Sequence, residues 1–203
     1  MRSLSEIETT AKRATRAIGY SWGVAEEVAK SIRLLELFGL PGIKNINQYY
    51  EDKKDKKFTN LNLIVEKNIC SSEAFCPVSL GVSFLDQVRS LENLKKIQFT
   101  NIAYPIIFVS FLSRASEIIG KKIYIIIDEN KILLNFNLSI SSNMVNKEFP
   151  EFGKNIEIQF KENQDSFTDN EWKNLYKLSE NTFVEESESL KQGAAGAGLT
   201  DND

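Results

Sequence analysis

The first forty residues carry two apolar stripes at helical spacing, each with a start signal and a stop signal. The stripes consist of Leu4, Ile7, Ala11, Ala14 and Ile18, and then of Val24, Val28, Ile32, Leu35 and Phe38. Ser3 and Ser21 precede the stripes, where a hydroxyl can accept a hydrogen bond from a free backbone N–H. Gly19 and Gly39 follow the stripes, at positions where a helix commonly ends on a residue with left-handed backbone angles. Pro41 cannot continue the second helix. The pattern predicts a helical hairpin over residues 1–42.

The stripes also predict which side chains of the hairpin are buried. We expect Trp22, at the turn, to cover one end of the buried set. That set is predicted to be Leu4, Ile7, Ile18, Val28, Ile32, Leu35 and Phe38.

The middle of the chain gives weaker signals. We expect a polar loop or linker over residues 43–60, because the stretch is rich in Lys, Asp and Asn. LNLIVE (Leu61–Glu66) favours a strand, residues 70–81 an irregular connection, and the segment around Phe84 a short amphipathic stretch. A strand is predicted from Lys96 to Phe99. Pro105 then opens a helix that ends at Gly120.

From Lys122 onward the apolar residues recur at every second position instead of at helical spacing. IYIIID and ILLNFNLSI flank a predicted hairpin turn at Glu129–Asn130, and NIEIQF (155–160) alternates in the same way. Such alternation indicates an antiparallel sheet with one solvent-exposed face. Thr168 and Glu171 then form a capping box that opens a C-terminal helix. The pattern predicts a single α+β domain over residues 1–180, followed by a tail over 181–203.

Composition excludes several classes of function. Histidine is absent from the 203 residues, which removes imidazole general bases, Ser-His-Asp triads and His-ligated metals. The net charge of −3 argues against nucleic acid and anionic membranes as partners. Apolar runs stay shorter than the roughly 18–20 residues of a membrane span, and no signal-peptide core opens the chain. We therefore expect a cytoplasmic protein.

Cysteines and carboxylates are the groups that remain for catalysis. Cys70 and Cys76 lie six positions apart, and two thiols could act as an acid/base pair, although reduced core cysteines are the plainer interpretation. A structural zinc ion would need four ligands, so we predict no metal site. Glu26 and Glu27 open the second helix, where they complement the helix dipole or could serve as acid/base groups.

The stretch GAAGAGLTDND (Gly193–Asp203) is the most unusual segment of the sequence. It is no phosphate-binding loop, because it lacks the Gly-Lys-Ser/Thr ending and a helix to follow it. A free tail and a docked tail both fit the composition. In the docked case the slim Gly196 and Gly198 would fit a narrow groove, Leu199 would fill a pocket, and Asp201 and Asp203 would meet cations.

Both ends of the chain carry distinctive motifs. Near the N-terminus a turn with Gly19, Trp22 and Gly23 is followed by an Ala-Glu-Glu helix and a Gly-Leu-Pro-Gly exit. The sequence ends on TFVEESESLKQGAAGAGLTDND. In these motifs the chain resembles a bacterial family filed as domain of unknown function 3726. The resemblance implies no known activity. It does favour a docked tail, and it makes Trp22 and Gly23 candidate binding residues with the tail.

Two function classes follow. The first is a non-catalytic binding or accessory protein whose tail docks on itself, on a neighbouring subunit or on a protein partner. The alternative is a histidine-free small-molecule enzyme that uses Glu26, Glu27, Cys70 or Cys76. The sequence identifies no cofactor for either class.

Overall fold

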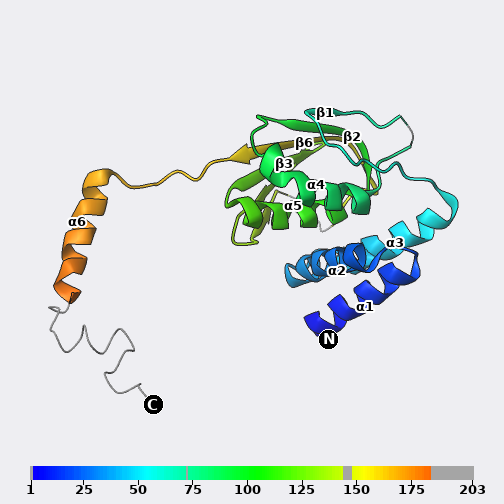
Figure 1. Cartoon of the computed structure of the whole chain (residues 1–203), viewed down its shortest axis with the longest axis horizontal. Coiled ribbons are helices and arrows are strands. Elements are labelled where there is room, and N and C mark those ends of the chain that lie inside the picture. Colours follow the sequence, from blue (N-terminus) through cyan, green and yellow to red (C-terminus); the bar gives the residue numbers. More distant parts are fainter. Residues whose placement is uncertain (1, 72, 144–147, 184–203) are drawn as a thin grey trace, which may run out of the picture. The chain divides into compact units, whose positions relative to one another are not determined.

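The structure, a computed structural model, describes residues 2–71, 73–143 and 148–183 (Figure 1). The chain divides into two compact units, one that runs to Asn163 and one that starts at Gln164. Their boundary falls inside the single domain predicted over residues 1–180. The first unit holds five helices and a six-stranded sheet among its described residues, and the second holds a sixth helix. The predicted α+β class is confirmed.

The N-terminal hairpin consists of α1 (Leu4–Ala17) and α2 (Trp22–Leu37). The hydroxyls of Ser3 and Ser21 accept hydrogen bonds from backbone N–H groups in the first turns, as predicted. Gly39 has a left-handed φ of 63°, and the Leu40 N–H donates to the carbonyl of Leu35. These bonds form a Schellman motif, so the end of α2 follows from its sequence.

The predicted buried set of the hairpin is only partly right. Val28, Ile32 and Leu35 are fully buried, but Ile18 and Phe38 are exposed. Each of these two residues is the C-cap of its helix, where the backbone leaves the helical path and carries the side chain out of the stripe. Trp22 is also exposed, at 57% of its surface, and does not cover the turn.

The predicted loop over residues 43–60 is wrong, because α3 (Gly42–Asp55) occupies most of it. Its buried face is formed by Asn45, Ile46, Tyr49 and Tyr50. These positions repeat at helical spacing, and the repeat is diluted by the polar residues around it. Gly42 lets the helix start close to α2, since a Cβ there would lie 2.9 Å from the Cβ of Leu35.

The sheet is mainly antiparallel, as predicted. Its strand order is β1 (Lys67–Asn68), β2 (Ile97–Ala103), β6 (Phe152–Lys161), β3 (Lys122–Ile127), β4 (Asn130–Leu134) and β5 (Ile140–Ser142). Only β1 and β2 pair in parallel among the described strands. The latest strand in the sequence, β6, lies in the interior of the sheet between β2 and β3.

Leu61–Glu66 does not form the predicted strand. Side chains take the backbone bonds that a neighbouring strand would otherwise make: Gln87 accepts from the Ile64 N–H and donates to the Asn62 carbonyl. The Asn68 side chain likewise accepts from the Val65 N–H and donates to the Val65 carbonyl. The segment is therefore irregular, and strand β1 is short.

Residues 135–139 form a hairpin loop where the sequence predicts a continuous strand. The Asn135 N–H donates to the Ser139 carbonyl, and the Leu138 N–H donates back to the Asn135 carbonyl. Leu138 has a φ of 66°. Two asparagines that favour local turns outweigh the alternating pattern of apolar and polar residues.

Helices α4 (Pro77–Leu91) and α5 (Pro105–Ile119) cover one face of the sheet, and α1–α3 lie on the far side of α5 (Figure 1). Because α5 lies between two layers, nearly all of its side chains are buried. Gly81 of α4 packs on Phe111 so closely that a Cβ would lie 2.3 Å from the ring. This packing gives α1–α3 a rigid base.

The second unit contains α6 (Asp169–Ser179) and a short 3₁₀ turn, Glu180–Thr182. The predicted capping box is present: the Thr168 hydroxyl accepts from the Glu171 N–H, and the Glu171 carboxylate accepts from the Thr168 N–H. Phe167 stacks on Trp172 at 5.6 Å between ring centroids, which is the hydrophobic staple of a helix start. Local contacts thus define this helix.

Candidate functional site

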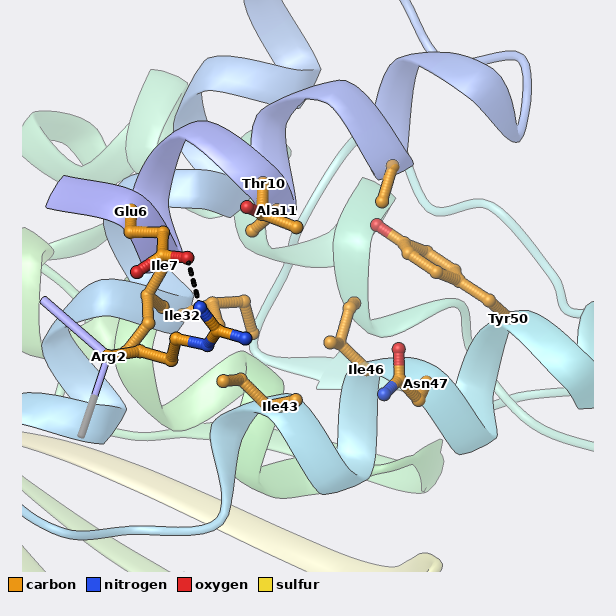
Figure 2. A pocket seen from close by; sticks show the side chains of 11 residues that line it. Arg2, Glu6, Ile7, Thr10, Ala11, Ile32, Ile43, Ile46, Asn47 and Tyr50 are labelled. Carbon is orange, nitrogen blue, oxygen red and sulfur yellow. Dashed lines mark hydrogen bonds and ion pairs between the residues drawn. The ribbon is translucent and has the colours of Figure 1, made fainter. Parts of the chain in front are cut away.

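An open apolar groove of about 320 Å³ lies between α1 and α3 (Figure 2). The two helices form its walls, and Ile32 of α2 lies at its floor. The apolar lining consists of Ile7, Ala11, Ala14, Ile32, Ile43 and Ile46. Ala11 and Ala14 on the α1 wall leave room that longer side chains would fill.

Tyr50 reaches across from α3 at one end of the groove (Figure 2). Its hydroxyl forms a hydrogen bond with that of Thr15 on α1. Thr15 donates its own proton to the Ala11 carbonyl at 2.7 Å, so the Tyr50 hydroxyl is the donor between the two. Burial raises the pKa of Tyr50 to about 12, which keeps this donor protonated at neutral pH. The bond ties the two walls together.

An ion pair lies at the other end of the groove. Arg2 Nη1 lies 2.9 Å from Glu6 Oε1, and both side chains are largely exposed (Figure 2). An exposed pair one helical turn apart holds its partners weakly. This end can therefore rearrange around a bound molecule, whereas the Tyr50 end is fixed.

The polar groups of the groove lie around its edge. Thr10 on α1 and Asn47 on α3 are exposed, and each offers hydrogen-bonding atoms beside the apolar lining. An apolar interior with a few polar groups at its edge is the usual composition of a small binding site. The arrangement can bind one apolar side chain or a row of them.

Behind the groove, α3 is anchored through Tyr49. Its hydroxyl lies 2.9 Å from Cys76 Sγ and 2.7 Å from the hydroxyl of Tyr20. Burial, followed by the proximity of Cys76, raises the pKa of both Tyr20 and Tyr49. Cys76 Sγ also accepts from the Ser79 N–H at the start of α4. One buried network thus connects the hairpin turn, α3 and α4.

A second anchor of α3 is Asp52. Its carboxylate accepts a hydrogen bond from the Tyr104 hydroxyl at 2.9 Å and pairs with Lys56 at 2.8 Å. The Lys56 ammonium is the main cause that lowers the pKa of Asp52. Burial, followed by the Asp52 carboxylate, raises the pKa of Tyr104, which precedes α5 with a left-handed φ of 45°. This contact fixes α3 on α5 and so positions one wall of the groove.

The candidate catalytic carboxylates are engaged in ion pairs. Glu26 lies 3.0 Å from Lys12 and 3.1 Å from Lys30, and these ammonium groups, Lys12 first, lower its pKa. Glu27 pairs with Arg114 of α5 and with Lys30. The predicted contact with the helix dipole is wrong, because α2 starts at Trp22 and has no acidic residue in its first turn. The two carboxylates instead tie α2 to its neighbours.

The candidate catalytic thiols are both buried. Cys76 belongs to the tyrosine network, and the backbone N–H of Cys70 donates to the Thr100 hydroxyl at 2.9 Å. Neither residue lines the α1–α3 groove. Sequence reasoning proposed the thiols but missed the tyrosine partners of Cys76, because those lie 27 and 56 residues away along the chain.

The candidate binding residues Trp22 and Gly23 also lie outside the groove, at the start of α2. The Arg16 guanidinium lies 5.6 Å from the ring centre of Trp22, which borders a separate shallow hollow with Lys12 and Arg13. The other candidate binding residues, in the tail, lie outside the described residues. They are Gly196, Gly198, Leu199, Asp201 and Asp203.

The groove lies in the part of the chain that matches a known protein family. Residues 2–74 match the family described as Protein of unknown function (DUF3726). The resemblance inferred from the hairpin is therefore confirmed over these residues, and every residue that lines the groove falls among them. Searches of curated proteins and of solved structures found no match.

In the part of the chain that the structure describes, no group of three or more Cys, Asp or Glu side chains could hold a metal ion. No helix in the same part is long and apolar enough to cross a bilayer.

Proposed function

We propose that this chain is a bacterial, cytoplasmic, non-catalytic binding protein whose α1–α3 groove takes the apolar face of a helix from a protein. The open apolar groove between two exposed helices is the observation that carries the proposal. Helix-in-groove recognition uses this combination of an apolar channel and a polar edge.

The length of the groove supports a helical ligand. Its α3 wall runs from Ile43 to Tyr50, which lie seven positions apart, or about 10 Å along the helix. A ligand helix presents its apolar anchors at i, i+3 or i+4, and i+7, and so spans the same distance. A volume of about 320 Å³ is enough for two or three large side chains from such a helix.

The enzyme alternative stays a hypothesis, and its strongest group is Cys76. The thiol lies at the N-terminus of α4 with two tyrosine hydroxyls beside it, but it is 2% exposed. Its contacts with Tyr20 and Tyr49 hold the hairpin turn and α3 to α4, and its contact with the Ser79 N–H caps α4, which is what a structural network requires. A metabolite-library thermal-shift screen separates the classes, since a ligand at a hundred times its Kd adds about 2.7 kcal/mol to stability.

An apolar fluorescent probe tests the groove directly. We expect anilinonaphthalene sulfonate to bind the full chain, and Thr10→Arg to weaken that binding by about tenfold because the long side chain fills the groove. Thr9→Arg is the matched control, since Thr9 is equally exposed on α1 but borders the other hollow. The experiment is run in a Leu175→Asp background, which removes probe binding to the apolar face of α6. Equal affinity of the two arginine variants would contradict the proposal.

A further inference from the structure

The apolar face of α6 is exposed. Trp172, Leu175 and Tyr176 are exposed at 53%, 62% and 52% of their surfaces, and all eleven residues of the helix are exposed. A helix of eleven residues is marginal in water, and most helices gain their stability from packing an apolar face. The sequence of α6 therefore specifies a helix that is completed by a partner surface.

These three side chains are spaced for a groove. Trp172, Leu175 and Tyr176 stand at i, i+3 and i+4, so they share one side of the helix, and Lys173 and Lys177 flank that side next to Tyr176. The capping box and the Phe167–Trp172 stack set the start of the helix before any partner is present. A preformed helix loses less conformational entropy when it binds.

The helix matches the α1–α3 groove in length. Trp172 and Ser179 are seven residues apart, about 10 Å along the helix, which equals the span of the α3 wall from Ile43 to Tyr50. Large side chains on α6 would meet Ala11 and Ala14 on the α1 wall.

Charge complementarity sets the direction of the helix. Asp169 lies in the first turn of α6 and Lys177 in the last. Arg2, in its exposed pair with Glu6, lies at the Ile43 end of the groove. Glu51, in an exposed pair with Lys54, follows the edge residue Asn47 by one helical turn toward the other end. With α6 parallel to α3, Asp169 approaches Arg2 and Lys177 approaches Glu51.

We infer that α6 of one copy of this chain occupies the α1–α3 groove of a second copy, in a reciprocal two-fold dimer. The inference rests on the proposed function, because it names the partner of the same groove. Each copy carries one groove and one exposed helix, so in a two-fold dimer both grooves and both helices are covered. A membrane surface is a poorer partner, since α6 has two acidic and two basic residues rather than a Lys/Arg-rich polar face.

Sedimentation velocity on mixed variants tests the inference. Thr10→Arg removes the groove and Leu175→Asp removes the helix face, and both sites are exposed, so the fold is kept. Each variant alone is expected to be monomeric at concentrations where the original chain is dimeric, a loss of at least about tenfold in dimer affinity. Their mixture restores a dimer through one intact contact. Thr9→Arg and Asn174→Asp, which lies on the opposite side of α6, are the matched controls and stay dimeric.

Trp172 reports the same contact optically. The chain has two tryptophans, so Trp22→Phe leaves Trp172 as the sole one. Its emission is expected to shift to the blue as the protein is concentrated and to return on dilution. A blue shift that is independent of concentration in a monomer would place the helix on its own chain and overturn the inference, as would a dimer that survives Leu175→Asp. Binding of α6 to phosphatidylcholine–phosphatidylglycerol vesicles by a chain that stays monomeric would also overturn it.

The failure of this inference is distinguishable from failure of the proposed function. If Thr10→Arg abolishes probe binding while the original chain stays monomeric at every concentration, the groove binds apolar groups and α6 of a second copy is not its ligand. If probe binding is indifferent to Thr10→Arg, the groove itself is not a binding site and both ideas fail.

Discussion

Helices α3 and α6 are alike in composition but depend on different interactions. Both carry charged residues around a few large apolar and aromatic side chains. Hydroxyls of Tyr49, Tyr50 and Tyr104 join α3 to α4, α1 and α5. By contrast, α6 is defined by the Thr168–Glu171 box and the Phe167–Trp172 stack, all within six residues. A helix defined locally is visible in its sequence, and a helix defined by tertiary contacts is not.

The largest expected effect of this contrast is at Tyr49. Tyr49→Ala removes a fully buried ring that stacks near three other aromatic rings, and it should lower the free energy of unfolding by about 3–5 kcal/mol. Trp172→Ala, on the exposed face of α6, is the comparison and should change it by less than about 0.5 kcal/mol in the monomer. Urea titration measures both. Similar losses would mean that α6 is packed as firmly as α3.

Removal of the Tyr49 hydroxyl alone isolates the buried network. Tyr49→Phe keeps the ring but leaves Cys76 Sγ and the Tyr20 hydroxyl without that partner, and should cost about 1–3 kcal/mol in urea unfolding. Tyr176→Phe removes an exposed hydroxyl from α6 and serves as the matched control. No difference between the two variants would show that the network contributes specificity rather than stability.

Loss of the N-cap should affect α6 only. Thr168→Ala removes one acceptor of the capping box and should weaken the helix by about 1 kcal/mol. Amide hydrogen exchange is the suitable measurement, with faster exchange within Asp169–Ser179 and unchanged protection in α3. Faster exchange that spread into α3 would contradict the local character of α6.

The smallest effect concerns pH and Asp52. Lys56, above all, lowers the folded-state pKa of this carboxyl, so its stabilising contribution is complete above the unfolded pKa of about 4 and is lost as pH falls through the lower folded pKa. The difference in unfolding free energy between the original chain and Asp52→Asn should therefore shrink as pH is lowered from 5 toward 2, measured by urea titration. A difference that grew in acid would refute this assignment.

The same contrast explains which parts of the fold the sequence predicts. Caps at Ser3, Ser21 and Thr168 and the stop at Gly39 involve neighbours within five residues, and each is present. The α3 helix was missed because Pro41, at its N-cap, has no polar side chain to signal the start. Its apolar positions acquire meaning only when α2, α4 and α5 are placed against them.

The candidate groove could not be predicted from the sequence, for a related reason. Ala11 and Ala14 fit the stripe expected to face α2, and nothing local indicates that a third helix stands opposite them. The predicted site residues Glu26, Glu27 and Trp22 were chosen for their chemistry. The groove, in contrast, is a space that remains because the side chains between the packed helices are small. Such space depends on where Gly42 and the tyrosine contacts place α3.

The position of β6 in the sheet has a consequence during synthesis. Strands β2 and β3 are complete once residue 127 has been translated, but the place between them is filled only by Phe152–Lys161. Until then each strand presents a row of unpaired N–H and C=O groups, which is a template for pairing with another nascent chain. Chains that stop before residue 152 should therefore aggregate, and folding should wait for this long-range pairing.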